Sequence, residues 1–175
     1  MGFRDSKATP LNVGSCLIAC TPVSALKCFV LSACAPTKQS ILLVEDQEND
    51  IILTKLALQR CELSLPVYSV PGGLEAIAYL NGDPPYQDRS RHPLPLLVLM
   101  DVRLPRMDGF GVLKWIRSQS GFDTLPVVML TGSTDIRDAD MAFKLGATSF
   151  LVKSTDFTTE LSRTVDRLIS RETGV

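Results

Sequence analysis

From Ile41 onward, short runs of apolar residues alternate with longer amphipathic stretches. The apolar runs predict five strands, at residues 41–44, 67–70, 96–100, 127–130 and 149–152. The amphipathic stretches that follow them predict five helices, at residues 49–60, 73–80, 110–118, 135–145 and 156–170. Strands that are apolar throughout are typical of parallel sheets with helices on both faces. The alternation therefore predicts an α/β protein with a flavodoxin-like (βα)5 fold, a doubly wound parallel five-stranded sheet covered by helices on both faces.

Residues 81–95 interrupt this pattern. They contain Gly82 and four prolines, so they predict a loop. His92, the only histidine of the chain, lies in this loop. We therefore expect neither a Ser-His-Asp nor a Cys-His catalytic arrangement.

Polar side chains follow the predicted strands at the point where each strand ends. Glu45 and Asp46 follow the first strand, Asp101 the third, Thr131 the fourth and Lys153 the fifth. In doubly wound sheets, ligands bind beyond the carboxyl ends of the strands. Three carboxylates at one edge repel one another unless a cation joins them, and an all-oxygen cluster suits Mg²⁺. Lys153 would offer positive charge to a phosphoryl group, and Thr131 a hydrogen-bond donor.

Each of these residues also has a simpler interpretation when it is taken alone. Glu45 and Asp46 could be solvated acids or a helix cap, Thr131 could belong to a turn, and Lys153 could face solvent. Asp101 is harder to explain in this way, because residues 96–100 deliver it from what should be a central buried strand. The joint pattern favours a functional site.

These residues carry a resemblance to a known family. Residues 41–171 resemble the receiver domain of two-component response regulators in four segments: ILLVED at 41–46, LVLMDVRLPRMDG at 97–109, VVMLTG at 127–132 and FLVK at 150–153. Within that family, Asn49-Asp50 and residues 79–82 look like the small stand-alone regulators associated with phytochromes and related sensor kinases.

The resemblance implies a role for each site residue. Asp101 would accept a phosphoryl group from the phosphohistidine of a sensor histidine kinase. Asp46, Asp101 and the backbone carbonyl of Arg103 would bind Mg²⁺ directly, and Glu45 would act mainly through a water molecule. Thr131 and Lys153 would hold the phosphoryl oxygens, as the charge on them must be neutralised during transfer.

The resemblance also implies a conformational switch. Movement of Thr131 toward the phosphoryl group would vacate space, which the ring of Phe150 would turn inward to fill. That rearrangement would bias the surface formed by the fourth helix, fifth strand and fifth helix. The simpler alternative is that Phe150 is an ordinary core aromatic.

Two features depart from the family pattern. Ser154 stands after Lys153, where the family usually has a proline in a cis bond. The bond is therefore either cis at a cost of roughly 3 kcal/mol or trans in a reshaped loop. Arg103 and Ser133 occupy positions whose side chains overhang the phosphate in this family and tune its hydrolysis. The Arg103 cation would shield the acyl phosphate or reach toward Glu45.

Charge and cysteine content divide the chain in two. Residues 1–40 hold four basic residues and one acidic residue, a net +3, which leaves fourteen basic and eighteen acidic residues, a net −4, in 41–175. Four of the five cysteines lie in the first part, without a CxxC pair, so neither a disulfide framework nor a zinc site is expected. A reducing cytoplasm fits residues 41–175 best, and their acidic balance argues against direct DNA binding.

We expect residues 1–40 to be a leader, either disordered or produced by a start assigned too far upstream. The uncharged stretch 8–26 is interrupted by Pro10, Gly14 and Pro22 and is not expected to span a membrane. Residues 31–34 resemble a bacterial lipoprotein cleavage box, but Lys27 interrupts the apolar region before it. Residues 41–175 would form the receiver domain.

The leading hypothesis is therefore a single-domain response regulator that is phosphorylated at Asp101 and signals by protein contact, not an enzyme that turns over a substrate. Only 22 residues follow Lys153, so we expect no output domain. One alternative is a phosphorylation-independent interaction module on the same fold. Another is a phosphohydrolase with an Asp nucleophile, but Arg103 replaces the second Asp expected in such enzymes.

The charged residues of the fourth and fifth predicted helices allow a further hypothesis. They could form a homodimer face that includes the fifth strand, or simply a solvated surface. The residues are Arg137, Asp138, Asp140, Lys144, Arg163, Asp166 and Arg167.

Overall fold

The structure is a computed structural model that describes residues 39–61 and 65–173, so the predicted leader up to residue 38 lies outside the described residues. Five strands form one parallel sheet in the order β2-β1-β3-β4-β5. They are β1 (Ile41–Val44), β2 (Val67–Val70), β3 (Leu97–Asp101), β4 (Val127–Thr131) and β5 (Ser149–Val152). The helices are α1 (Glu48–Leu58), α2 (Gly73–Asn81), α3 (Gly109–Ser118), α4 (Ile136–Lys144) and α5 (Phe157–Thr173). The predicted doubly wound fold is confirmed.

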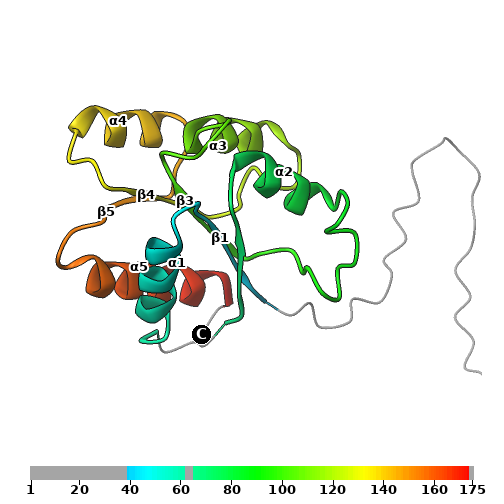
Figure 1. The fold of residues 1–175 in the computed structure, drawn as a ribbon, viewed down its shortest axis with the longest axis horizontal. Helices are drawn as coiled ribbons and strands as arrows, with labels where there is room; N and C mark the ends of the chain where they lie inside the picture. Colours follow the sequence, from blue (N-terminus) through cyan, green and yellow to red (C-terminus); the bar gives the residue numbers. More distant parts are fainter. Residues whose placement is uncertain (1–38, 62–64, 174–175) are drawn as a thin grey trace, which may run out of the picture. The chain divides into compact units, whose positions relative to one another are not determined.

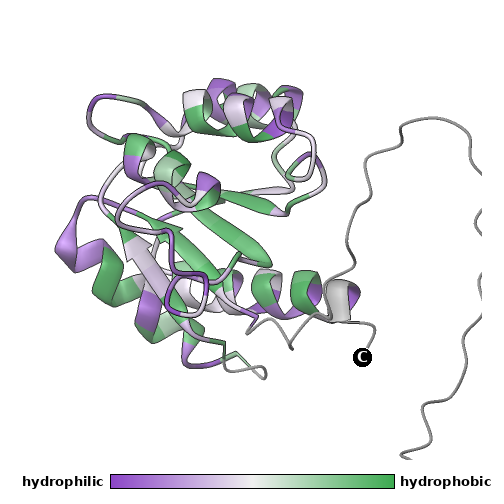
Figure 2. Ribbon diagram, turned by 90° about the vertical axis from the view of Figure 1, so that its right-hand side faces the viewer, coloured by the Kyte–Doolittle hydropathy of each residue, from purple (hydrophilic) through white to green (hydrophobic). Residues whose placement is uncertain are grey.

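The helices cover both faces of the sheet. Helices α1 and α5 lie on one face, and α2, α3 and α4 lie on the other (Figure 1). Alternate residues of a strand supply the two cores: Leu42 and Val44 of β1 belong to the cluster beneath α2 and α3, whereas Ile41 and Leu43 belong to the cluster beneath α1 and α5. Strand β1 is therefore apolar along its whole length, whereas the edge strands β2 and β5 include Ser69 and Ser149. The helices carry polar residues on their outer sides (Figure 2).

The strand order determines at which point of the sheet the ends of β1 and β3 meet. The chain leaves β1 toward β2 on one side and later enters β3 on the other side of β1. Helices on opposite faces follow β1 and β3 (Figure 1), so the loops after these two strands diverge at the carboxyl edge, where doubly wound sheets form a ligand-binding crevice. Residues at the ends of β1 and β3 are thus brought to one crevice.

The loop from β3 to α3 folds back tightly on the end of β3. The amide of Gly109 donates a hydrogen bond to the Val102 carbonyl at 3.0 Å. A Cβ atom at Gly109 would collide with the main-chain oxygen of Asp101. Glycine at the first position of α3 therefore permits the close approach that fixes the backbone of Asp101.

The proline-rich segment predicted as a loop is an ordered loop between α2 and β3. The Tyr79 hydroxyl donates to the Pro93 carbonyl at 2.9 Å. The Arg89 guanidinium donates to the carbonyls of Tyr79 and Leu80, each at 2.7 Å, and so satisfies groups at the C-terminal end of α2. The His92 ring lies among tyrosine rings, 5.8 Å from that of Tyr79 between centroids.

No helix within residues 39–61 and 65–173 combines the length and apolar character needed to cross a membrane. The longest helix, α5, is amphipathic and uses its apolar side to pack on the sheet.

Candidate functional site

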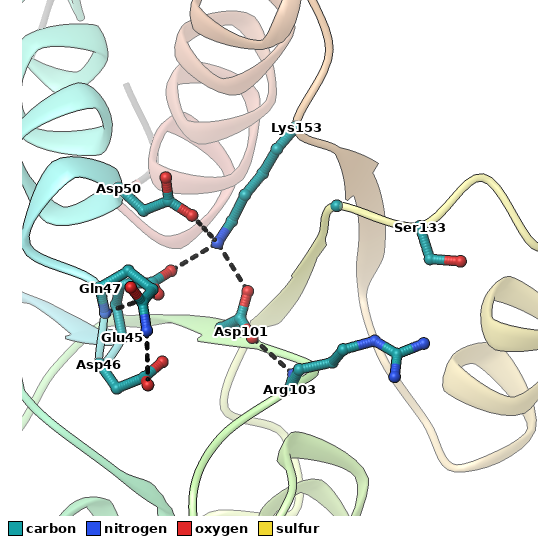
Figure 3. A pocket seen from close by; sticks show the side chains of 9 residues that line it. Glu45, Asp46, Gln47, Asp50, Asp101, Arg103, Ser133 and Lys153 are labelled. Atoms are coloured by element: carbon teal, nitrogen blue, oxygen red, sulfur yellow. Dashed lines mark hydrogen bonds and ion pairs between the residues drawn. The ribbon is translucent and has the colours of Figure 1, made fainter.

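A cavity of about 410 Å³ lies at the crevice between the ends of β1 and β3. Its lining brings together residues that are more than one hundred positions apart in the sequence (Figure 3). The lining residues are Glu45, Asp46, Gln47, Asp50, Asp101, Arg103, Gly132, Ser133 and Lys153. Four of the five predicted strand-end residues, Glu45, Asp46, Asp101 and Lys153, are therefore brought together at the cavity, while Thr131 is not among its described lining residues.

Lys153 lies at the centre of this site. Its Nζ donates to Glu45 Oε2, Asp50 Oδ2 and Asp101 Oδ1, each at 2.6 Å. The side chains of Lys153, Glu45 and Asp101 are only 11%, 1% and 8% exposed. Each of the three ammonium protons can thus be matched to one carboxylate. Lys153 thus compensates Glu45 and Asp101, two of the three strand-end carboxylates, while Asp46 is hydrogen-bonded to Gln47 instead.

Burial and pairing shift the pKa of two site residues. Burial alone would lower the pKa of Lys153, but hydrogen bonds to Asp101, Asp50 and Glu45 outweigh it and raise that pKa well above its ordinary value. Burial raises the pKa of Glu45, and the nearby Asp101 adds to the increase, while Lys153 opposes both. Lys153 is therefore a cation at neutral pH, and it counteracts the rise in the pKa of Glu45.

Asp101 is fixed through both carboxylate oxygens. Oδ1 accepts from Lys153, and Oδ2 accepts from the backbone N–H of Arg103 at 2.5 Å. The Arg103 side chain extends away from Glu45, toward the side of the cavity on which Ser133 lies (Figure 3). Of the two directions expected for the Arg103 side chain, the structure therefore shows the one that does not reach Glu45.

Asp46 differs from its neighbour Glu45 because it is exposed. Its Oδ2 accepts from Gln47 Nε2 at 2.9 Å, while the backbone N–H of Gln47 donates to Glu45 Oε1 at 3.2 Å. Gln47 therefore binds both acids of the pair. This arrangement leaves Asp46 facing the cavity and solvent.

We tested whether these residues fit a divalent metal. Within the part of the chain that the structure describes, no three His, Cys, Asp or Glu side chains are grouped closely enough to hold a metal ion. Mg²⁺ does not require three, because it usually keeps several waters and binds one or two carboxylates. Asp46, Asp101 and the main-chain oxygen of Arg103 are all oxygen donors beside one cavity, so the donor set fits Mg²⁺.

Thr131 and Phe150 lie on the neighbouring strands β4 and β5, outside the described lining of the cavity. Thr131 is buried, and its hydroxyl oxygen accepts from the Ser133 N–H at 3.0 Å. The cavity wall beside Thr131 is formed by Gly132 and Ser133. Phe150 is half-buried and packs against the core cluster beneath α2, α3 and α4.

The peptide bond between Lys153 and Ser154 is trans. The cis bond found within the described residues joins Pro84 and Pro85. The amides of Lys153 and Ser154 donate to the carbonyls of Thr131 and Val152, at 2.7 and 2.8 Å. The reshaped-loop alternative is therefore the one adopted, and Lys153 still reaches the cavity.

Asp50 and Gln47 are cavity residues that the strand-end argument did not assign to the site. Both belong to the start of α1 and not to the end of a strand. The signal that could have found them is the short β1–α1 connection, since a helix separated from a strand by only three residues presents its first turn to the same edge.

The fold and the site together define a class of protein. A doubly wound domain with paired acids after β1, a buried Asp at the end of β3 and a Lys after β5 has the features of a receiver-type signalling domain. Residues 41–165 match the response regulator receiver domain family, and the chain therefore belongs to that family.

Comparison with individual proteins points to stand-alone members of the family. The chain is 33% identical to the response regulator Rcp1 of Synechocystis over 65% of this chain and 76% of Rcp1. The structure of phosphorylated RcpA, a cyanobacterial phytochrome response regulator, is similar with a TM-score of 0.64 and 32% identity over 75% of this chain and 91% of RcpA. The bacteriophytochrome response regulator AtBRR has a TM-score of 0.64 and 37% identity over 75% and 93% of the two chains. The chain is thus a receiver domain homologous to stand-alone response regulators, including those of phytochromes.

Proposed function

We propose that Asp101 is the phosphoacceptor of this receiver and that a sensor histidine kinase, of the phytochrome-like type or a relative, is the donor. One observation carries the proposal: a buried Asp carboxylate at the end of the central strand β3 is hydrogen-bonded to Lys153, which lines the same cavity. In the transfer, an Asp101 oxygen bonds to phosphorus, the phosphorus–nitrogen bond of the donor phosphohistidine breaks, and the electron pair returns to the imidazole ring.

The protein groups around Asp101 have distinct roles in this step. The Arg103 N–H and Lys153 orient the Asp101 carboxylate before transfer. Lys153 then shares its charge with the phosphoryl oxygens, and the hydroxyl of Thr131 donates to one of them. Because the phosphoryl group needs positioning and charge neutralisation more than proton transfer, no histidine base is required.

The proposed cofactor is Mg²⁺, held by Asp46, Asp101 and the Arg103 carbonyl, with Glu45 acting through water. A Mn²⁺-bound form of the related Rcp1 supports a divalent metal. When bound, the ion supplies positive charge for the carboxylates and the phosphoryl oxygens. Gln47 orients Asp46 for this role through its 2.9 Å hydrogen bond.

The proposed output is a change at the face formed by α4, β5 and α5. Thr131 moves toward the phosphoryl group, Phe150 fills the space behind it, and the altered face binds a protein partner or a second copy of the chain. Hydrolysis of the acyl phosphate, a slow autodephosphorylation, resets the domain. We propose that these steps occur in the cytoplasm without direct binding to DNA, in keeping with the net −4 charge of residues 41–175.

Acetyl phosphate, a small acyl phosphate, tests the proposal without knowledge of the kinase. Intact mass should show one added phosphoryl group in the presence of Mg²⁺ and none after EDTA. Asp101→Asn should remain unlabelled. The control Asp108→Asn should still be labelled, because it removes the nearby carboxylate that caps α3. Persistence of the adduct in Asp101→Asn would disprove the assignment. Absence of any adduct in the wild type would favour the phosphorylation-independent module.

A further inference from the structure

Asp50 contacts Lys153 although neither the strand-end pattern nor the family resemblance gives it a role in the chemistry. Its Oδ2 accepts from Lys153 Nζ at 2.6 Å, the same distance as for Glu45 and Asp101. Its side chain is 35% exposed, so it lies at the rim of the cavity, while the other two carboxylates lie inside. Asp50 is therefore a third anionic partner of the site lysine, supplied by α1.

The position of Asp50 in its helix makes this contact informative. An acidic residue in the first turn commonly stabilises the positive end of its own helix, or bonds back to the N-cap amide in a capping box. Here the amide of the N-cap residue, Gln47, donates to Glu45, and Gln47 provides no side-chain cap. The Asp50 carboxylate instead points across the cavity to the lysine at the end of β5 (Figure 3).

The three partners of Lys153 come from three elements. Glu45 follows β1, Asp101 ends β3 and Asp50 belongs to α1. When Asp101 carries a phosphoryl group, a phosphoryl oxygen must replace Asp101 Oδ1 as the acceptor of this hydrogen bond from Lys153. The contacts to Glu45 and Asp50 can persist during this exchange, because neither carboxylate reacts.

We propose that Asp50 is a positioning residue for phosphoryl transfer, which tethers Lys153 so that only its bond to Asp101 is exchanged for one to the phosphoryl group. The inference rests on the proposed role of Asp101. In this proposal, the first turn of α1 takes part in the reaction through Asp50. The oxygen atom of Asp50 that accepts the hydrogen bond matters more than the negative charge of its carboxylate. Asparagine retains such an oxygen, whereas alanine does not.

Two readouts test the tether in the full chain. Phosphorylation by acetyl phosphate with Mg²⁺ should slow about tenfold in Asp50→Ala, since a hydrogen bond to a charged group is lost, and should stay within about twofold in Asp50→Asn. The ¹H–¹⁵N signal of the Lys153 ammonium, assigned by its loss in Lys153→Met, should be observable in the wild type and Asp50→Asn, and should broaden in Asp50→Ala through faster proton exchange with water. Glu48→Ala is the matched control, as it removes an exposed acid from the same helical turn.

Several results would overturn the tether. It fails if Asp50→Ala is phosphorylated at the wild-type rate and keeps the ammonium signal. It also fails if Glu48→Ala slows the reaction equally, because the effect would then belong to the helix end. If the wild type is not labelled at all, the proposed function fails, while the ammonium signal of the metal-free protein still decides whether Asp50 holds Lys153. Asp50→Asn keeps the test valid if Asp50→Ala does not fold.

Discussion

At the scale of single residues, Lys153 decides the electrostatics of the site. Its ammonium is the shared partner of Glu45, Asp50 and Asp101, and two of these carboxylates are almost fully buried. Removing one partner from such a cluster leaves buried charges without compensation. Lys153 therefore has a structural role that precedes its role toward a phosphoryl group.

Replacing Lys153 by Met should destabilise the metal-free protein in a pH-dependent way. We expect a loss of about 3 kcal/mol in the free energy of unfolding near pH 7. Without the ammonium, the pKa of Glu45 in the folded protein rises further above its usual 4.5. As the pH increases, the Glu45 carboxyl therefore ionises in the unfolded chain before it ionises in the folded protein, which favours unfolding. The loss should thus be small below pH 4.5 and grow toward pH 7, whereas Lys153 itself does not titrate in this window.

Urea unfolding of the wild type and Lys153→Met at several pH values checks this prediction. Lys114→Met is the control, since it removes an exposed lysine of α3 and should change stability little. An equal loss at low and neutral pH would mean that packing of the lysine stem, and not charge compensation, explains the effect.

At the scale of elements, the loop between α2 and β3 shows how a segment rich in helix breakers can still be well fixed. The proline content predicts a loop, but it does not predict the hydrogen bonds that hold the loop to α2. These bonds join the Arg89 side chain to backbone carbonyls, and a sequence pattern does not show such contacts. Arg89 donates to two carbonyls at the end of α2 through separate nitrogens. A planar guanidinium can do this, and a lysine cannot.

Arg89→Ala should therefore lower the free energy of unfolding by about 2 kcal/mol, the order of a hydrogen bond from a charged group. Arg89→Lys should recover little of this loss. Arg91→Ala is the matched control: its side chain is 82% exposed and its ion pair with Asp88 should contribute almost nothing. Chemical denaturation of the three variants makes the comparison. Equal losses for Arg89→Ala and Arg91→Ala would remove Arg89 as the anchor.

The comparison of sequence and structure is also clearest at the scale of elements. The five strands and five helices were predictable because their hydrophobic periodicity and strand-end chemistry agree. Asp50 was not, because its contact with Lys153 depends on the angle at which α1 leaves β1. The direction of the Arg103 side chain and the trans bond before Ser154 likewise depend on the local backbone, which composition and spacing do not specify.

At the scale of the whole molecule, α4 carries exposed apolar side chains beside the charged residues that the sequence suggested for a dimer face. Ile136 and Phe143 are 75% and 55% exposed. They are seven residues apart and so lie on one side of the helix. Arg137, one of the predicted dimer residues, is paired with Asp135 of its own chain. The apolar pair is the stronger candidate for the contact with a second copy.

Sedimentation velocity before and after treatment with acetyl phosphate and Mg²⁺ tests this surface. We expect a larger dimer fraction after phosphorylation, and a loss of that dimer in Phe143→Asp. Leu74→Asp, an exposed apolar residue of α2, serves as the control and should leave association unchanged. A monomer in both states would contradict the homodimer and leave a different protein as the partner of this face.

The most direct test of the central claim is to locate the phosphoryl group. Borohydride reduces an aspartyl phosphate to homoserine, so the modified residue can be read from peptide masses after digestion. After acetyl phosphate and Mg²⁺, we predict homoserine at position 101 and unmodified aspartate at positions 46, 50 and 108. Homoserine at any of those three positions with Asp101 intact would contradict the account.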